Sequence, residues 1–166
     1  MKYRIVYESR TGNTEKVARA IAECLPAEQT ELTNLMVQQP YKDAEVYFVG
    51  FGVRQSTCSL RVLDFLSLLH DKTVVLFATC GMEPTQAYHD LLERVVEAFL
   101  PDVCDYRGLF LCQGAVTEEG IAALKGRLNG DAEKIERLEA FCATSQEHQN
   151  DEDLEHVRRF VEHILE

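Results

Sequence analysis

The sequence predicts an α/β fold in which a doubly wound, five-stranded parallel sheet carries helices on both faces. Three observations lead to this prediction. Five candidate strands alternate with segments of helical spacing. The run 72–79, KTVVLFAT, is the most continuous apolar stretch, which is typical of a central parallel strand covered on both faces. Residues 3–25 contain a strand signal, a hydroxyl-rich turn and a helix signal in immediate succession.

The first half of the chain supplies three of the predicted strands. Residues 5–7 form a short apolar run suited to a buried strand, and helical spacing then follows over 17–25. Pro26 stops this helix because it cannot continue the hydrogen-bond pattern. Residues 29–33 predict a short, mostly polar second strand, and the β-branched and aromatic run 45–51 predicts the third.

The second half continues the alternation. A helix is predicted over 60–69, and the central strand 72–79 follows it. Thr85 is a suitable N-cap for the next helix, and residues 109–112 predict the fifth strand. Helical spacing returns weakly over 121–128. The run 150–153, NDED, is well placed to begin a final amphipathic helix, because its acidic residues lie at the N-terminus.

Length and composition predict a single domain over residues 1–166, with an acidic polar insertion at about 129–153. No apolar run approaches the ~20 residues that span a bilayer, and the N-terminus resembles no secretory signal. The six cysteines lack zinc-site spacing, so we expect reduced thiols, no metal site and a cytoplasmic location. The net charge of −11 argues against nucleic-acid binding and permits docking to a basic protein surface.

Six adjacent residues between the first strand and the first helix predict a phosphate site. They are Ser9, Arg10, Thr11, Gly12, Asn13 and Thr14. The first N–H groups of a helix have no partner inside it, and the helix dipole adds partial positive charge there. The hydroxyls would add neutral donors, and Gly12 lets the backbone approach an anion closely. Neither the P-loop nor the G-x-G-x-x-G motif follows this strand. The alternative is a turn that merely caps the helix.

The same six residues resemble the phosphate loop of flavodoxins, in which Ser/Thr-x-Thr-Gly-Asn-Thr follows the first strand. The run 109–114 and the acidic residues before the last helix are also similar to a subgroup of short bacterial flavodoxin-family proteins. That subgroup includes companions of bacterial reductases, one of them associated with bilirubin reduction. The resemblance implies a flavodoxin-like sheet with strand order 2-1-3-4-5, and FMN bound by the loops after strands one, three and four.

In this resemblance the loop after the third strand would contact the flavin ring through Phe51, Gly52 and Val53. Phe51 is the candidate for a flat side chain against the ring, and the alternative is that it is the last core residue of its strand. The family often carries Trp in this loop, whereas this chain contains none. Gly52 stands near that position and could offer its backbone carbonyl to the flavin.

The loop after the fourth strand would provide backbone N–H groups to the pyrimidine edge of the ring through Thr79, Cys80 and Gly81. Tyr88 could stack from the other side, although its helical spacing also suits the core. Cys80 has no resolving cysteine nearby in sequence, so we interpret it as structural. No catalytic residue is predicted.

Three functions are compatible with these observations. The first is a flavodoxin-like electron carrier that binds FMN and delivers electrons to a partner reductase or acceptor. The second is a flavin-dependent NAD(P)H:quinone or small-molecule reductase, for which no dedicated motif is present. The third is a flavin-poor accessory subunit of a reductase that docks through the acidic stretch 129–153. The electron carrier is favoured over a stand-alone enzyme.

Overall fold

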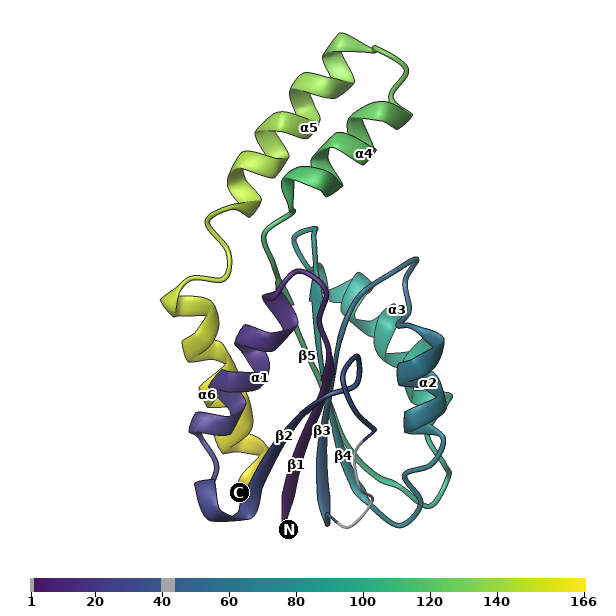
Figure 1. The fold of residues 1–166 in the computed structure, drawn as a ribbon, viewed down its shortest axis with the longest axis vertical. Helices are drawn as coiled ribbons and strands as arrows, with labels where there is room; N and C mark the ends of the chain where they lie inside the picture. The colour runs from purple at the N-terminus through teal and green to yellow at the C-terminus, as the bar shows by residue number, and fades with distance from the viewer. Residues whose placement is uncertain (1, 40–43) are drawn as a thin grey trace.

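The computed structural model describes residues 2–39 and 44–166, which form one sheet flanked by helices (Figure 1). Its five strands are β1 (Tyr3–Glu8), β2 (Thr30–Asn34), β3 (Val46–Gly52), β4 (Thr73–Cys80) and β5 (Asp105–Gln113). The helices are α1 (Asn13–Glu23), a short 3-10 helix η1 (Ala27–Gln29), α2 (Leu60–Leu66), α3 (Gln86–Glu97), α4 (Glu118–Arg127), α5 (Ala132–Ser145) and α6 (Asp151–Leu165). The strand order is β2-β1-β3-β4-β5, and all neighbouring pairs are parallel. The predicted fold class and strand order are confirmed.

Two pairs of helices cover the two faces of the sheet (Figure 1). On one face, α1 and α6 pack against an apolar cluster that contains Phe48 and Phe77. On the other face, α2 and α3 contribute to a cluster that contains Tyr47 and Val49. Neighbouring residues of β3 belong to different clusters because side chains of a strand alternate between its two faces. The central strands are therefore buried on both sides, as their apolar runs predict.

Gly50 is a packing requirement of the central strands. It pairs with Phe77 across the β3–β4 ladder. A Cβ added at Gly50 would lie 2.1 Å from two ring carbons of Phe77. The Phe77 ring thus occupies the space that a side chain at position 50 would need.

Several element boundaries match the sequence pattern, whereas α2 ends at Leu66 rather than at the predicted residue 69 and β5 begins earlier than predicted. Thr85 caps α3 by accepting a hydrogen bond from the Tyr88 N–H at 3.2 Å, and Asn150 begins α6 with a reciprocal capping box. Strand β5 begins at Asp105, four residues before the predicted run 109–112. Its first residues are partly exposed at the edge of the sheet, so they carry no apolar signal.

Helices α4 and α5 form a hairpin that projects beyond the carboxyl ends of the strands (Figure 1). The sequence pattern does not predict α5, which lies within the acidic polar stretch 129–153. No residue of α4 is fully buried, and in α5 only Cys142 and Ser145, near the base, are buried. The hairpin is therefore a two-helix element with a largely exposed surface.

No helix within residues 2–39 and 44–166 combines the length and the apolar character that crossing a membrane requires.

Replacing Gly50 with alanine should destabilise the protein by about 1–3 kcal/mol or more, because the new methyl group overlaps the Phe77 ring. Urea unfolding measures this loss. Gly126→Ala on α4 is the matched control, since its added Cβ meets nothing within 4 Å outside its own helix. There alanine should stabilise by roughly 0.5–1 kcal/mol. Equal unfolding midpoints for wild type and Gly50→Ala would contradict the packing described here.

Candidate functional site

A cavity of about 230 Å³ lies where the carboxyl ends of four strands converge. Loops after β1, β3, β4 and β5 all contribute to its walls. The lining residues are Glu8, Arg10, Thr11, Asn13, Thr14, Gly52, Val53, Arg54, Thr79, Cys80, Gly81, Gly114, Ala115, Val116 and Thr117. Polar side chains dominate the β1 side, whereas small and apolar residues dominate the walls formed by the other loops.

The loop after β1 turns directly into the N-terminus of α1. Gly12 is the N-cap residue with φ of 90°, a left-handed conformation that favours glycine. Its N–H donates to Ser9 Oγ at 3.1 Å, and its carbonyl accepts from the Lys16 N–H at 3.0 Å. Among the described residues, no side chain caps this helix. The first N–H groups of α1 therefore remain available to an anion.

Two side chains of the first turn of α1 connect this loop to other walls of the cavity. Asn13 Nδ2 donates to the carbonyl of Ala115 at 2.9 Å, which joins the loops after β1 and β5. Thr14 Oγ1 lies 2.9 Å from Thr79 Oγ1, which joins α1 to the end of β4. Thr14 and Thr79 are both buried. Their hydroxyls are thus partners of each other inside the protein.

Backbone hydrogen bonds connect the remaining loops. The Val53 N–H donates to the Thr79 carbonyl at 2.8 Å, and the Gly114 N–H donates to the Cys80 carbonyl at 2.9 Å. Beyond Val53 the chain makes a tight turn between Arg54 and Thr57, which exchange two backbone hydrogen bonds. The loops after β3, β4 and β5 are therefore held in register with one another at the cavity.

The charged residues of the cavity differ in their surroundings. Arg10 and Arg54 are exposed and place positive charge at its edge. Glu8 is buried, and it accepts a hydrogen bond of 2.7 Å from Ser59 Oγ. Its carboxylate also lies 3.7 Å from the guanidinium of Arg61. These two partners offset the negative charge of Glu8, which favours anion binding in the same cavity.

Most of the predicted site residues lie together at this cavity. Those that line it are Arg10, Thr11, Asn13, Thr14, Gly52, Val53, Thr79, Cys80 and Gly81. Ser9 and Gly12 belong to the same loop but shape its turn rather than the cavity wall. The structure thus brings the predicted phosphate loop next to parts of both predicted ring loops.

Two predicted residues lie elsewhere. Phe51 is only 1% exposed and belongs to the core on the α2–α3 side, because it shares that strand face with Val49. Tyr88 is half-buried on α3, and it does not line the cavity. The expectation that these two rings flank a flavin therefore does not fit this arrangement.

Sequence reasoning missed the contribution of the segment 114–117 and of Glu8. Gly114 follows the last residue of β5, and the carboxyl ends of parallel strands meet at one edge of a sheet. That rule, applied to the fifth strand as well as to the first, third and fourth, would have found the segment.

A second cavity of about 550 Å³ adjoins the first at the base of the α4–α5 hairpin. Both cavities share Thr11, Asn13 and the segment 115–117 as walls. The hairpin is anchored at Val116, whose N–H donates to Ser145 Oγ at 3.3 Å and whose carbonyl accepts from Gln146 Nε2 at 2.6 Å. The position of the hairpin is therefore fixed by a residue that also lines the first cavity.

Comparison with known protein families identifies the architecture. The sequence model of the flavodoxin domain matches residues 4–162, which is nearly the whole chain. The chain belongs to the flavodoxin family. Membership supports binding of a flavin and a redox role.

A related sequence extends the match over the full length. The flavodoxin-like domain-containing protein BilS of Clostridioides difficile (strain CD3) is 26% identical over 172 residues, covering 99% of this chain and 97% of the relative. The hairpin and the final helix therefore lie within the matched region.

Solved structures share the fold of this flavodoxin-family chain. Oxidised flavodoxin 2 from Bacillus cereus matches with a TM-score of 0.53 and 17% identity, over 89% of this chain and 99% of that one. A flavoprotein from Lactobacillus acidophilus NCFM, solved in complex with FMN, matches with a TM-score of 0.51 and 15% identity, over 66% and 92% of the two chains. At these identities the likeness concerns the fold.

Burial keeps the thiol at the cavity wall and a neighbouring buried thiol protonated at neutral pH. Cys80 is buried at the cavity wall, and its thiol donates to the Met82 carbonyl at 3.1 Å. Burial raises the pKa of the Cys80 thiol to about 11 and that of the Cys112 thiol to about 12. All six cysteines of the described structure are free, and no group of three or more acidic, His or Cys side chains among the described residues is arranged to hold a metal.

Cys80 should react slowly with iodoacetamide at pH 7.5. A thiol whose pKa rises from 9.0 to about 11 has about 100-fold less thiolate near neutral pH. The rate should increase as the pH approaches 11. Mass spectrometry of the Cys80 peptide measures the labelling, and the same peptide in urea is the control. Native labelling as fast as labelling in urea would contradict the burial of this thiol.

Proposed function

We propose that the protein is an electron carrier that binds FMN and delivers electrons to a partner protein. The observation that carries this proposal is the position of the loop 9–14. It brings the uncapped N-terminus of α1 into one cavity with the ends of β3, β4 and β5. Family membership supports the flavin, and the loop supports its phosphorylated form, because riboflavin has no group that needs an anion site.

The donors of the loop suit a phosphate monoester that stays bound. The first N–H groups of α1, the hydroxyl of Thr11 and the guanidinium of Arg10 are all able to donate hydrogen bonds. No lysine lines the cavity within the described residues, so the site resembles a holding site more than one for phosphoryl transfer. The buried carboxylate of Glu8 is directed to Ser59 and Arg61, which limits its repulsion of a phosphate.

The remaining walls suit a flat ring. Gly52, Gly81 and Ala115 let the backbone approach closely, and Val53 and Val116 add apolar surface. When bound, FMN supplies the redox chemistry by accepting electrons and passing them on. The chain holds its phosphate, orients its ring and contributes the negative field of a −11 net charge, which opposes the addition of electrons.

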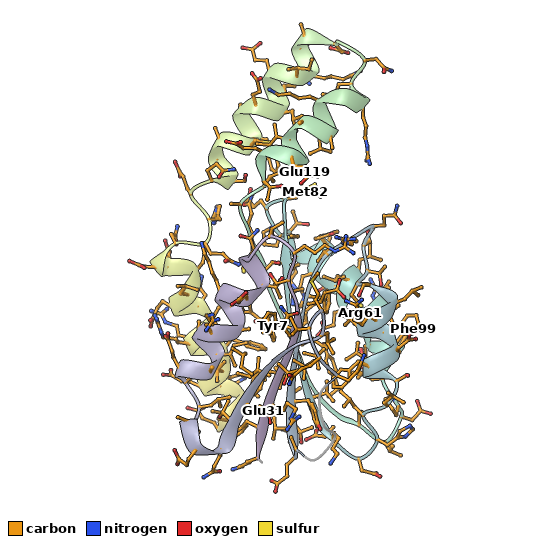
Figure 2. All side chains as sticks on the ribbon, in the orientation of Figure 1. Tyr7, Glu31, Arg61, Met82, Phe99 and Glu119 are labelled. Atoms are coloured by element: carbon orange, nitrogen blue, oxygen red, sulfur yellow. The ribbon has the colours of Figure 1, made fainter. Side chains whose placement is uncertain are left out.

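The α4–α5 hairpin is the proposed docking element for the redox partner. It projects beyond the carboxyl ends of the strands (Figure 1), and its base lines the cavity that adjoins the first one. Its apolar residues Leu124 and Phe141 are not fully buried. Its acidic residues Glu118, Glu119 and Glu136 are exposed. Figure 2 shows Glu119 at the foot of the hairpin, next to the carboxyl end of the sheet and far from Glu31 at the opposite end. This combination favours a partner with a basic surface.

Thr11→Val should weaken FMN binding about tenfold or more, because a hydrogen bond to a charged group contributes roughly 1.5–3 kcal/mol. Riboflavin binding should stay unchanged, since riboflavin lacks the phosphate. Titration followed by visible absorption or flavin fluorescence measures both affinities. Thr144→Val is the control, because Thr144 is exposed on α5 and bonds only within its helix. If Thr11→Val weakened riboflavin and FMN equally, the phosphate assignment would be wrong.

Removing three exposed carboxylates from the hairpin should slow electron delivery to a basic acceptor. The variant Glu118→Gln/Glu119→Gln/Glu136→Gln should reduce cytochrome c, used as a basic haem probe, several-fold more slowly at low salt. The difference should shrink as added salt screens the charges. Stopped-flow mixing of the FMN-loaded, chemically reduced protein with cytochrome c measures the rate.

The matched control carries the same change of charge away from the cavity. Glu28, Glu162 and Glu166 are exposed and lie in η1 and at the end of α6, at the opposite end of the sheet (Figure 1). The triple Gln variant at these positions should retain a rate close to that of wild type. If both triple variants slowed the reaction equally, the hairpin would not be the docking surface, and the slowing would be an effect of net charge alone.

A further inference from the structure

Two buried hydroxyls meet at the wall of the cavity. Thr14 is 2% exposed and Thr79 is 6% exposed, and their Oγ1 atoms lie 2.9 Å apart. Thr14 belongs to the first turn of α1, whereas Thr79 is near the end of β4, 65 residues further along the chain. Both residues line the cavity. The pair therefore faces the position at which α1 presents its free N–H groups.

The two hydroxyls have one proton more than their mutual hydrogen bond requires. Each hydroxyl can donate one hydrogen bond and accept two. One proton lies between the two oxygens, so the other is directed elsewhere. No other hydrogen bond is made by either hydroxyl within the described residues. The spare proton is consequently available to a ligand in the cavity.

A bound phosphate would determine which hydroxyl supplies that proton. The anion would sit at the N-terminus of α1, where the unpaired N–H groups and the helix dipole attract it. Thr14 is part of that turn, so its O–H would point to the anion and its oxygen would be left as an acceptor. Thr79 would then donate to Thr14. Because a phosphate dianion can only accept hydrogen bonds, Thr14 could not use its proton to donate to Thr79 and still bond the phosphate through its hydroxyl.

We propose that Thr79 is a positioning residue that orients the Thr14 hydroxyl toward the phosphate and so determines the preference for FMN over riboflavin. The inference rests on the proposed FMN function. Thr79 does not touch the phosphate in this arrangement and acts through Thr14. The same residue accepts the Val53 N–H through its carbonyl, so the phosphate end of the cavity is joined to the loop after β3 by one residue.

The experiment compares the affinities of Thr79→Val, Thr79→Ser and Thr14→Val for FMN and for riboflavin. Thr79→Val has nearly the same shape but no hydroxyl, and it should weaken FMN binding roughly tenfold while riboflavin binding stays the same. Thr79→Ser retains the hydroxyl and should bind FMN like wild type. The ³¹P resonance of bound FMN should shift in Thr79→Val and not in Thr79→Ser.

The double variant Thr14→Val/Thr79→Val tests whether the two hydroxyls act in series. Thr79→Val should have no further effect on FMN binding once Thr14 is valine, because there is no hydroxyl left to orient. Additive losses would overturn the proposal, and so would equal losses for FMN and riboflavin in Thr79→Val, which indicate direct contact or simple structural damage. A wild-type protein that binds FMN no better than riboflavin would instead refute the proposed function itself.

Discussion

The first turn of α1 holds the cavity together through two side-chain hydrogen bonds. Asn13 bonds to the carbonyl of Ala115, and Thr14 bonds to Thr79. Each bond joins the loop after β1 to a different strand end, so the walls of the cavity depend on the same turn that presents free N–H groups to a ligand. The residues of the phosphate-loop pattern thus fix the loops around the cavity, and under the proposed function they would also form the anion site.

The position of the hairpin follows from this arrangement. Gly114 permits the close approach of Asn13, since a Cβ added there would lie 2.6 Å from the Asn13 amide nitrogen. Two residues further along, the backbone of Val116 both donates a hydrogen bond to Ser145 and accepts one from Gln146 at the base of α5. The hairpin itself buries little apolar surface, so these polar contacts determine its orientation. Any change that frees the turn of α1 from Ala115 would also loosen the proposed docking element.

The sequence was sufficient for the sheet because burial on both faces requires continuous apolar runs, such as 72–79. The edge residues 105–108 carry no such run and were missed. Helix α5 was not predicted, because most of its residues are polar or charged and its few apolar residues at helical spacing give only a weak signal. The face of the sheet to which Phe51 points depends on its position in the alternation of side chains along β3. The phosphate-loop motif carries no information about that position. The bond between Asn13 and Ala115 joins residues 102 apart, and no local pattern encodes such a contact.

The composition of the cavity walls suggests which part of a bound FMN would contribute most to its affinity: the phosphate rather than the ring. No aromatic side chain lines the cavity within the described residues, and Phe51 is in the core. Aromatic pairs contribute about 0.5–1.5 kcal/mol beyond the area that they bury, so a flavin here would lack that contribution. Hydrogen bonds to a charged phosphate, at roughly 1.5–3 kcal/mol each, would then supply a larger share of the affinity. If FMN binds as proposed, the orientation of one buried hydroxyl would therefore have a large effect on the preference for FMN over riboflavin.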